Sequence, residues 1–535
     1  MIIQSRMNPQ HKKQQRWMVA IALLYGSVLP CMLSFQKASA QESPDSALCP
    51  AEAEEAIAPI LQEPAFRSAR WGIRVETLAT HDASAQVLVD QEGDRLFIPA
   101  SNVKLLTTAA ALDVLGRDFQ IHTLVYREIA KSVSGTESAE GSEPDSDTGV
   151  DLRVVGRGDP TLTAADVSDV VRQLGDRGIR HIRTLTFDDH YFLPDAVNPT
   201  WEWGDVQAGY GAAASSFILN LNELRLVAYP SQVGEPVRVE WISEVNLDEW
   251  QIVNRTVTVP ATESGYTWAS RDLNRPVVYL DGQRPVGAPP DESAIAIADP
   301  TRHFADQLTS TLRTAGITVE QVAIAPQSTE LDELAPLEEI ARISSPSLAE
   351  LLPPTNRDSE NIYAEALLRH VGYAHQGAEV SPFFSPLDAG VEEITAQLTT
   401  LGIDPSGIRL ADGSGLSRQN LVSPAAFVAT LRAMARHPEA ELYRESLAIA
   451  GISGTLRNRL RDTLLEGRLY AKTGGLTGVA SVSGYLDPPN FEPLLVSIIL
   501  NHSRQSGQTN RDAIDRILLE LSRLQSCDEH LMQMR

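Results

Sequence analysis

Cysteine is scarce in this chain of 535 residues, which contains only three. No Cys-x-x-Cys pair occurs, and three cysteines cannot form a zinc ribbon, so a metal site would need histidine and carboxylate ligands. The eleven histidines show no ligand spacing. The only glycine-rich candidate follows a predicted strand as a turn and does not resemble a phosphate loop. We therefore expect no metal site and no cofactor.

Basic residues are also few, with 45 against 70 acidic residues and a formal net charge of −25. Nucleic acids and anionic membranes would repel such a chain, so we expect neither as a partner. Hydrophobic residues make up 43% and charged residues 21%, which is typical of a globular protein. The length corresponds to roughly three or four domains.

Long apolar runs are absent beyond the first forty residues. Residues 1–40 contain five bases and no acid, an apolar run over 17–35, and then the small residues Ala38-Ser39-Ala40. This order predicts a secretory signal cleaved after Ala40, and hence export to the periplasm or cell envelope. An uncleaved anchor is the alternative, but a glycine and a proline interrupt the run. We expect no membrane span after cleavage.

Cleavage would leave two cysteines, Cys49 and Cys527, at opposite ends of the mature chain. Cysteines in an exported protein meet an oxidising compartment and often pair. One hypothesis is a disulfide that ties the two ends together, and the alternative is two separate buried thiols.

Lysine is rare after residue 40, where Lys104, Lys131 and Lys472 stand against 37 arginines. Arginine keeps its proton near neutral pH, whereas a desolvated lysine can lose it and act as a general base. Lys131 borders an acidic low-complexity stretch and fits a solvated surface charge. The other two lysines lie in motifs.

The first motif is Ser101-Asn-Val-Lys104, at the start of a helix that we expect to run from about Pro99 to Gly116. A spacing of three places Ser101 and Lys104 on the same side of the helix. A neutral Lys104 could then accept the hydroxyl proton, and the helix dipole would favour negative charge near Ser101. Ser-x-x-Lys alone is a weak motif that often arises by chance.

The second motif is Lys472-Thr473-Gly474, at the end of a strand predicted over 469–473 and closed by Gly474 and Gly475. Such a strand can pair with an extended peptide and offer a hydroxyl and a cation to its carboxylate. The alternative is an ordinary strand end with a turn glycine. Further strands are predicted over 479–486 and 493–500, and a closing helix over about 511–524.

The third motif, Ser359-Glu-Asn361, lies where a loop enters a helix predicted from Asn361 onward. Pro353-Pro354 is expected to break the preceding helix. Helix capping by serine or asparagine explains this motif equally well when it is taken alone.

Ser-x-x-Lys, Ser-x-Asn and Lys-Thr-Gly in this order resemble the penicillin-recognising serine acyltransferases. The 258 residues from Ser101 to Ser359 exceed the spacing in class A β-lactamases. A long insertion between these two motifs instead resembles the class C low-molecular-mass penicillin-binding proteins, the D-alanyl-D-alanine carboxypeptidase/endopeptidase family. Further similar segments are 156–162 (Gly-Arg-Gly-Asp-Pro-Thr-Leu), Trp201-Glu202-Trp203, Tyr210-Gly211-Ala212 and 412–418 (Asp-Gly-Ser-Gly-Leu-Ser-Arg).

The resemblance implies an α+β fold with a discontinuous transpeptidase/β-lactamase-like domain, an antiparallel sheet flanked by helices. Its pieces would be residues 50–120, with strands over 72–78 and 87–90, and residues 340–535. Residues 121–340 would form one or two inserted β-rich domains, with strands over 237–242 and 256–259. A helix over 301–316 would return toward the first domain. Residues 134–150, rich in serine, glycine and acid, are predicted to be a flexible loop.

The resemblance also implies a mechanism on peptidoglycan stem peptides, with β-lactams as covalent inhibitors. Ser101 would be the nucleophile, Lys104 its base, and Ser359 a proton relay to the leaving amine. The substrate would be held by Asn361, Lys472, Thr473, Gly474 and Gly475, with backbone N–H groups of Ser101 and Gly475 as the oxyanion hole.

One position departs from the family, which usually has threonine or serine where this chain has Gly475. The hydroxyl that could bind the substrate carboxylate is missing there. Two alternatives remain open at this point: a non-catalytic cell-wall binding or scaffold protein on the same fold, and a β-lactamase or esterase using this site.

Overall fold

The computed structural model describes most of the chain beyond residue 46. The described ranges are 47–78, 85–129, 149–192, 196–242, 250–272, 275–326, 336–374 and 384–527. The predicted signal over 1–40 and residues 134–148 of the predicted acidic loop lie outside them. Within the described ranges, no helix is long and apolar enough to cross a bilayer.

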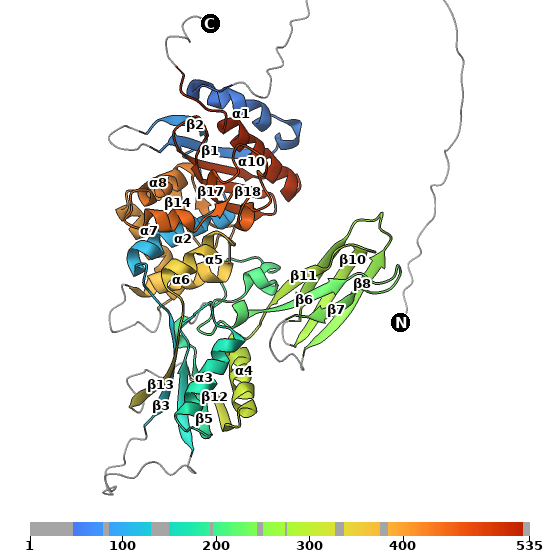
Figure 1. Cartoon of the computed structure of the whole chain (residues 1–535), viewed down its shortest axis with the longest axis vertical. Helices are drawn as coiled ribbons and strands as arrows, with labels where there is room; N and C mark the ends of the chain where they lie inside the picture. The colour runs from blue at the N-terminus through green and yellow to red at the C-terminus, as the bar shows by residue number, and fades with distance from the viewer. Residues whose placement is uncertain are drawn as a thin grey trace, which may run out of the picture. The chain divides into compact units, whose positions relative to one another are not determined.

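A six-stranded antiparallel sheet combines the two ends of the sequence, in the order β16-β17-β18-β19-β1-β2 (Figure 1). Its N-terminal strands β1 and β2 occupy the predicted positions, and β18 has the predicted bounds. The strands are β1 (Arg70–Thr77), β2 (Val87–Gln91), β16 (Ala448–Ile449), β17 (Leu469–Leu476), β18 (Val479–Leu486) and β19 (Leu494–Asn501).

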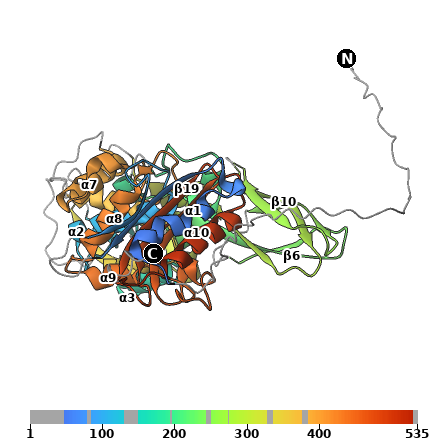
Figure 2. The same ribbon diagram turned by 90° about the horizontal axis from the view of Figure 1, so that it is seen from above.

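Two hydrophobic cores cover the two faces of this sheet. Every residue of β19 is buried, and its side chains alternate between the cores, with Leu495 and Ile499 in one and Val496 and Ile498 in the other. A continuous apolar run is what a strand covered on both faces requires. Helices α1 (Ala53–Leu61) and α10 (Gly507–Leu521) pack together on one face, and α8 (Pro424–Met434) on the other (Figures 1 and 2).

Helix α2 (Val103–Leu115) lies inside the core that contains Leu495 and Ile499. It packs there against α5 (Leu348–Asn356), α6 (Asn361–Ala374), α7 (Pro386–Thr400) and α8. Its first ten residues are all buried, which explains its almost uninterrupted apolar sequence. Gly116, with φ of 78°, ends the helix in a conformation that favours glycine. The predicted helix from Pro99 to Gly116 therefore matches the structure closely.

The inserted segment contains two substructures. The first is a five-stranded mixed sheet, β12-β5-β4-β3-β13, with two helices packed on it. Its elements are β3 (His122–Glu128), β4 (Val150–Val155), α3 (Ala164–Asp176), β5 (His181–Asp188), α4 (Pro300–Thr314), β12 (Thr318–Ile324) and β13 (Leu337–Ser344). The second is a pair of three-stranded sheets, β11-β6-β7 and β8-β10-β9. Its strands are β6 (Glu223–Tyr229), β7 (Arg238–Trp241), β8 (Gln251–Val259), β9 (Tyr266–Arg271), β10 (Val277–Pro285) and β11 (Asp291–Ala296).

Two expectations about the insertion need correction. The helix predicted over 301–316 exists as α4, but Phe304, Leu308 and Leu312 bury it against α3 and β12 instead of leading it back to the first domain. The predicted boundary at residue 340 falls inside β13, whose pairing with β3 keeps it in the five-stranded sheet. We therefore propose that the C-terminal piece of the catalytic domain starts after Ser344.

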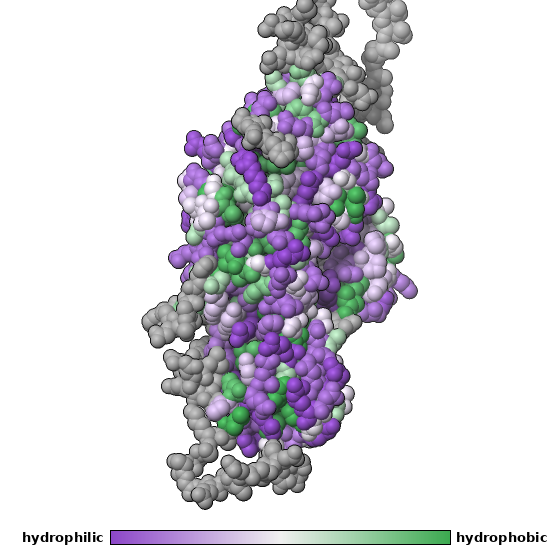
Figure 3. Space-filling model, turned by 60° about the vertical axis from the view of Figure 1, so that its left-hand side comes forward, coloured by the Kyte–Doolittle hydropathy of each residue, from purple (hydrophilic) through white to green (hydrophobic). Residues whose placement is uncertain are grey.

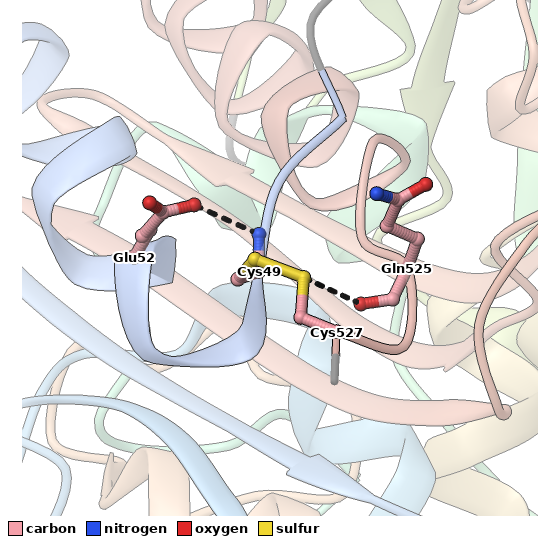
Figure 4. Close-up of a disulfide and its surroundings, with 4 residues drawn as sticks. All are labelled: Cys49, Glu52, Gln525 and Cys527. Carbon is pink, nitrogen blue, oxygen red and sulfur yellow. Dashed lines mark hydrogen bonds between the residues drawn. A yellow bond between two sulfur atoms is a disulfide. The ribbon is translucent and has the colours of Figure 1, made fainter. Parts of the chain in front are cut away.

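A disulfide joins Cys49 to Cys527, with their Cα atoms 5.7 Å apart (Figure 4). The adjoining backbone is paired as well, since the Leu48 N–H donates to the Arg523 carbonyl and the Gln525 N–H donates to the Leu48 carbonyl. Both ends of the described chain are thus fixed beside α1 and α10.

The face shown in Figure 3 is mostly hydrophilic, with hydrophobic residues in small separate groups.

Candidate active site

Ser101 lies in a turn of 3-10 helix over Ala100–Asn102, directly before α2. The preceding Ala100 has φ of 50°, a left-handed conformation that costs a non-glycine residue about 1–2 kcal/mol. A Cβ atom on Gly415 would come within 1.9 Å of the Ala100 carbonyl oxygen. The loop that carries Gly415 therefore packs directly behind the Ser101 segment and holds it in this conformation.

The Lys104 ammonium is fully buried and lies next to the Ser101 hydroxyl. Its Nζ is 3.1 Å from Ser101 Oγ, 2.6 Å from Asn361 Oδ1 and 2.7 Å from the Ser414 carbonyl oxygen. Burial lowers the pKa of Lys104 from 10.5 to about 8, against the opposing effect of nearby carboxylates. A substantial fraction of Lys104 is therefore neutral near pH 8, as a general base requires.

Ser359 lies in the short loop between α5 and α6, with φ of 71°. The prediction that Pro353-Pro354 ends the preceding helix was wrong, because α5 continues to Asn356. The prolines lie near its C-terminal end, where their carbonyl oxygens still accept the N–H groups of Arg357 and Glu360. The Ser359 hydroxyl accepts a hydrogen bond from Lys472 Nζ at 2.8 Å.

Lys472 projects from β17, which does not stop at the two glycines as predicted. The strand continues to Leu476, since Gly474 pairs with Ser481 and Gly475 with Ala480 of β18. Burial, reinforced by the positive charge of Lys104, lowers the pKa of Lys472 well below its ordinary value. The positive field expected from Lys472 is thus opposed by its own surroundings.

The two glycines after Thr473 have different surroundings. A Cβ atom on Gly474 would lie 2.7 Å from the Pro99 carbonyl oxygen and 3.0 Å from the Ser101 nitrogen, so glycine lets β17 pass close to Ser101. No atom lies within 4 Å of a Cβ placed on Gly475. The Thr473 hydroxyl donates to Thr455 Oγ1 at 2.7 Å.

Two buried carboxylates that the motif analysis did not select hold the loop behind Ser101. Glu365 of α6 accepts the N–H groups of Gly413 and Ser414, both at 3.0 Å. Asp412 accepts the Gly415 N–H at 2.7 Å and the indole N–H of Trp201, from the insertion, at 2.9 Å. Segment 412–418 was noted only for its family resemblance, and no sequence signal marks Glu365.

A pocket of about 410 Å³ opens onto Ser101 and is also lined by Ser359 and Asn361. The rest of its lining from the catalytic domain is Gly415, Leu416, Arg418, Gly475, Leu476 and Thr477, whereas Lys104, Lys472, Thr473 and Gly474 are not part of it. The insertion contributes Glu202, Asp205 and Tyr210, and the Tyr210 carbonyl oxygen accepts the Asn361 amide at 2.7 Å. Among the described residues, no group of three or more His, Cys, Asp or Glu side chains is placed to hold a metal ion.

A family model described as the D-Ala-D-Ala carboxypeptidase 3 (S13) family matches residues 53–521. The chain belongs to this S13 family. The family predicted from the three motifs is thereby confirmed, together with the α+β class and the discontinuous catalytic sheet. The three motifs, far apart in sequence, lie together in the structure, since Ser101, Ser359 and Asn361 line one pocket and Lys472 hydrogen-bonds Ser359.

Individual proteins that are similar to this chain cover most of its length. A D-alanyl-D-alanine carboxypeptidase of Actinomadura sp. (strain R39) is 32% identical, with 86% of this chain and 84% of that relative covered. Penicillin-sensitive carboxypeptidase A of Dictyostelium discoideum is 27% identical, with 85% and 87% covered. Among solved structures, penicillin-binding protein 4 of Haemophilus influenzae superposes with a TM-score of 0.72 at 22% identity, covering 87% of this chain and 98% of that one.

Proposed function

We propose that this protein is a penicillin-sensitive serine carboxypeptidase/endopeptidase that cleaves peptidoglycan stem peptides after a D-alanine, through an acyl-enzyme on Ser101. The observation that carries the proposal is the fully buried Lys104 amine, which lies 3.1 Å from the Ser101 hydroxyl. Burial lowers the pKa of this amine to about 8. A scaffold protein would not require a desolvated lysine beside a pocket serine, because burying an ammonium without a contacting carboxylate is costly.

Each catalytic group has a place in the reaction. Ser101 Oγ attacks the carbonyl carbon of the penultimate D-alanine while Lys104 takes its proton. The N–H groups of Ser101 and Gly475 would stabilise the oxyanion. The peptide C–N bond then breaks as Ser359, hydrogen-bonded to Lys472, passes a proton to the leaving D-alanine amine. The proton that Lys104 took from Ser101 replaces it, so that the net transfer is from Ser101 to the amine and Lys104 is neutral again. Lys104 then takes a proton from the water that attacks the ester and returns it to Ser101 Oγ as the ester C–O bond breaks.

Lys472 would be the cation that meets the substrate carboxylate. Burial and the charge of Lys104 lower its pKa in the free enzyme, and an incoming carboxylate would act in the opposite direction and favour the ammonium. Thr473 is positioned beside Lys472 to donate its hydroxyl to the same carboxylate.

Peptidoglycan lies outside the cytoplasmic membrane, so this function requires export. The basic and apolar pattern of residues 1–40 and cleavage near Ala40 support that location. The disulfide between Cys49 and Cys527 supports an oxidising compartment.

Release of D-alanine from an acylated peptide ending in D-Ala-D-Ala tests the proposal. We expect penicillin to block this release of D-alanine. We also expect no release of the terminal L-alanine from the matched peptide ending in L-Ala-L-Ala. A folded protein that penicillin does not label and that releases no D-alanine would favour the binding-protein alternative. Rapid turnover of a chromogenic cephalosporin would favour the β-lactamase alternative.

Replacing Gly475 with threonine is expected to raise kcat/KM for D-alanine release several-fold, by about 1 kcal/mol of added hydrogen bonding to the substrate carboxylate. The open space around Gly475 accommodates the side chain without displacing a neighbour. Gly475→Ala is the matched control, since it adds the Cβ without the hydroxyl. Unchanged D-alanine release in Gly475→Thr would show that the missing hydroxyl is unimportant.

A further inference from the structure

A second pocket, of about 580 Å³, adjoins the active-site pocket and shares Tyr210 with it. Glu360, which stands between the two motif residues Ser359 and Asn361, lines this second pocket. A third pocket, of about 400 Å³, continues from the second and shares three lining residues with it: Leu221, Glu223 and Arg225. The second pocket thus shares lining residues with both the active-site pocket and the third pocket.

The second pocket combines exposed aromatic rings with charged and hydroxyl groups. Trp268 of β9 is 69% exposed and Tyr210 is 56% exposed, although both are large aromatic side chains. Glu223 and Arg225 of β6 contact each other at 3.3 Å in the same lining, which also contains Thr267 and Ser293. Exposed aromatic rings at the edge of a polar pocket are typical of a ligand site.

The walls of the pocket are held by close packing. Glycine is needed at position 209, because a Cβ there would lie 2.3 Å from Glu223 Oε2 and 2.6 Å from the Ala294 Cβ. The turn that carries Tyr210 can therefore pack directly on the Glu223 carboxyl group. Burial raises the pKa of Glu223 to about 7, so its carboxyl group is able both to donate and to accept hydrogen bonds near neutral pH.

A strained backbone segment forms another wall. Asn220, Leu221 and Asn222 have consecutive φ values of 48°, 61° and 53°. The buried Asn222 amide holds this segment by donating to the carbonyl oxygens of Ala213 and Phe217, both at 3.0 Å. Left-handed conformations outside glycine are unfavourable and concentrate at ligand and catalytic sites.

We propose that this Trp268 pocket, lined by Tyr210, Leu221, Glu223, Arg225, Trp268 and Glu360, binds an N-acetylated amino sugar of the glycan strand that carries the stem peptide. A pyranose ring has an apolar C–H face that stacks on an indole, and peripheral hydroxyl and acetamido groups that bond to carboxyl and guanidinium groups. The inference rests on the proposed function, because stem peptides are attached to such a strand.

Kinetics on two substrates test the proposal. We expect the protein to release D-alanine from a disaccharide-linked pentapeptide with a higher kcat/KM than from the free pentapeptide. Trp268→Ala should lower kcat/KM on the linked substrate about tenfold, as loss of one aromatic stacking contact would, and leave the free pentapeptide unaffected. Tyr266→Ala is the matched control, because Tyr266 lies on the same strand, is 62% exposed and does not line the pocket.

A binding measurement makes the test independent of catalysis. The Ser101→Ala protein is titrated with a peptide-free glycan fragment of N-acetylated amino sugars by isothermal titration calorimetry, a signal that does not depend on Trp268. We expect saturable binding that Trp268→Ala abolishes and Tyr266→Ala retains.

The outcomes separate this inference from the proposed function. Equal kcat/KM on the two substrates, together with no glycan binding, would overturn the sugar site while the carboxypeptidase assignment stands. An equal loss on both substrates in Trp268→Ala would assign the pocket to peptide and also overturn it. Absence of D-alanine release from either substrate would count against the proposed function, and the glycan titration would still decide the pocket.

Discussion

Alanine in place of Ser101 is expected to abolish covalent labelling by a fluorescent penicillin and to lower D-alanine release by about 10⁴-fold or more. The variant has no oxygen to form the acyl ester. The Ser101 hydroxyl accepts one hydrogen bond, from Lys104, and lies at the pocket surface, so the folded structure loses little. Gel fluorescence after incubation with the labelled penicillin measures the effect, and the thermal unfolding midpoint shows that the variant is folded.

Ser168→Ala provides a control with the same chemical change at a distant place. Ser168 lies on α3 in the insertion, where its hydroxyl bonds the Ala164 carbonyl oxygen. This variant should label as strongly as the unaltered protein. Persistent labelling of Ser101→Ala would place the nucleophile elsewhere, with Ser359 as the next candidate in the pocket.

Replacing Lys104 with methionine is expected to slow acylation of Ser101 by about 10³-fold, the usual contribution of a positioned general base. In the unaltered protein the acylation rate should rise with pH and level off above about pH 8, because only the neutral amine accepts the proton and its pKa is about 8. The methionine variant should lose this pH dependence as well as the rate. Time courses of penicillin labelling between about pH 6 and pH 10 measure both effects.

Methionine keeps the length and burial of the side chain but removes its hydrogen bonds to Asn361 and Ser414. Unfolding midpoints therefore accompany the kinetics, and penicillin concentrations are kept saturating. A pH-independent rate in the unaltered protein, or an unchanged rate in Lys104→Met, would move the base role to Lys472.

The strands and motifs of the catalytic sheet were predictable from sequence because their signals are local. A nearly continuous apolar run predicts a central strand such as β19, and the scarcity of lysine draws attention to Lys104 and Lys472. The order of the motifs predicts that Ser101, Ser359 and Lys472 meet. In the structure Lys104 hydrogen-bonds Ser101, Lys472 hydrogen-bonds Ser359, and both serines line the same pocket. Their catalytic roles remain predictions that the variants above test.

Features that depend on tertiary packing were not predictable. Gly474 and Gly475 suggest a strand end, yet pairing with β18 carries β17 through them. Glu365 appears in sequence as an ordinary helical glutamate, and only the fold brings the loop over 412–418 onto it. The packing partner of α4 was likewise not predictable. Its helical periodicity shows that it has an apolar face but not which sheet that face packs against.

The bridge between Cys49 and Cys527 closes nearly the whole described chain into a covalent ring. A protease that cuts the backbone once, anywhere between these two cysteines, would therefore produce a nicked molecule of unchanged connectivity instead of two separate fragments. Ser101 and Lys472 would stay on one covalent assembly even if every connection through the insertion were severed. The two halves of the active site are thus tethered twice, once through the insertion and once through sulfur.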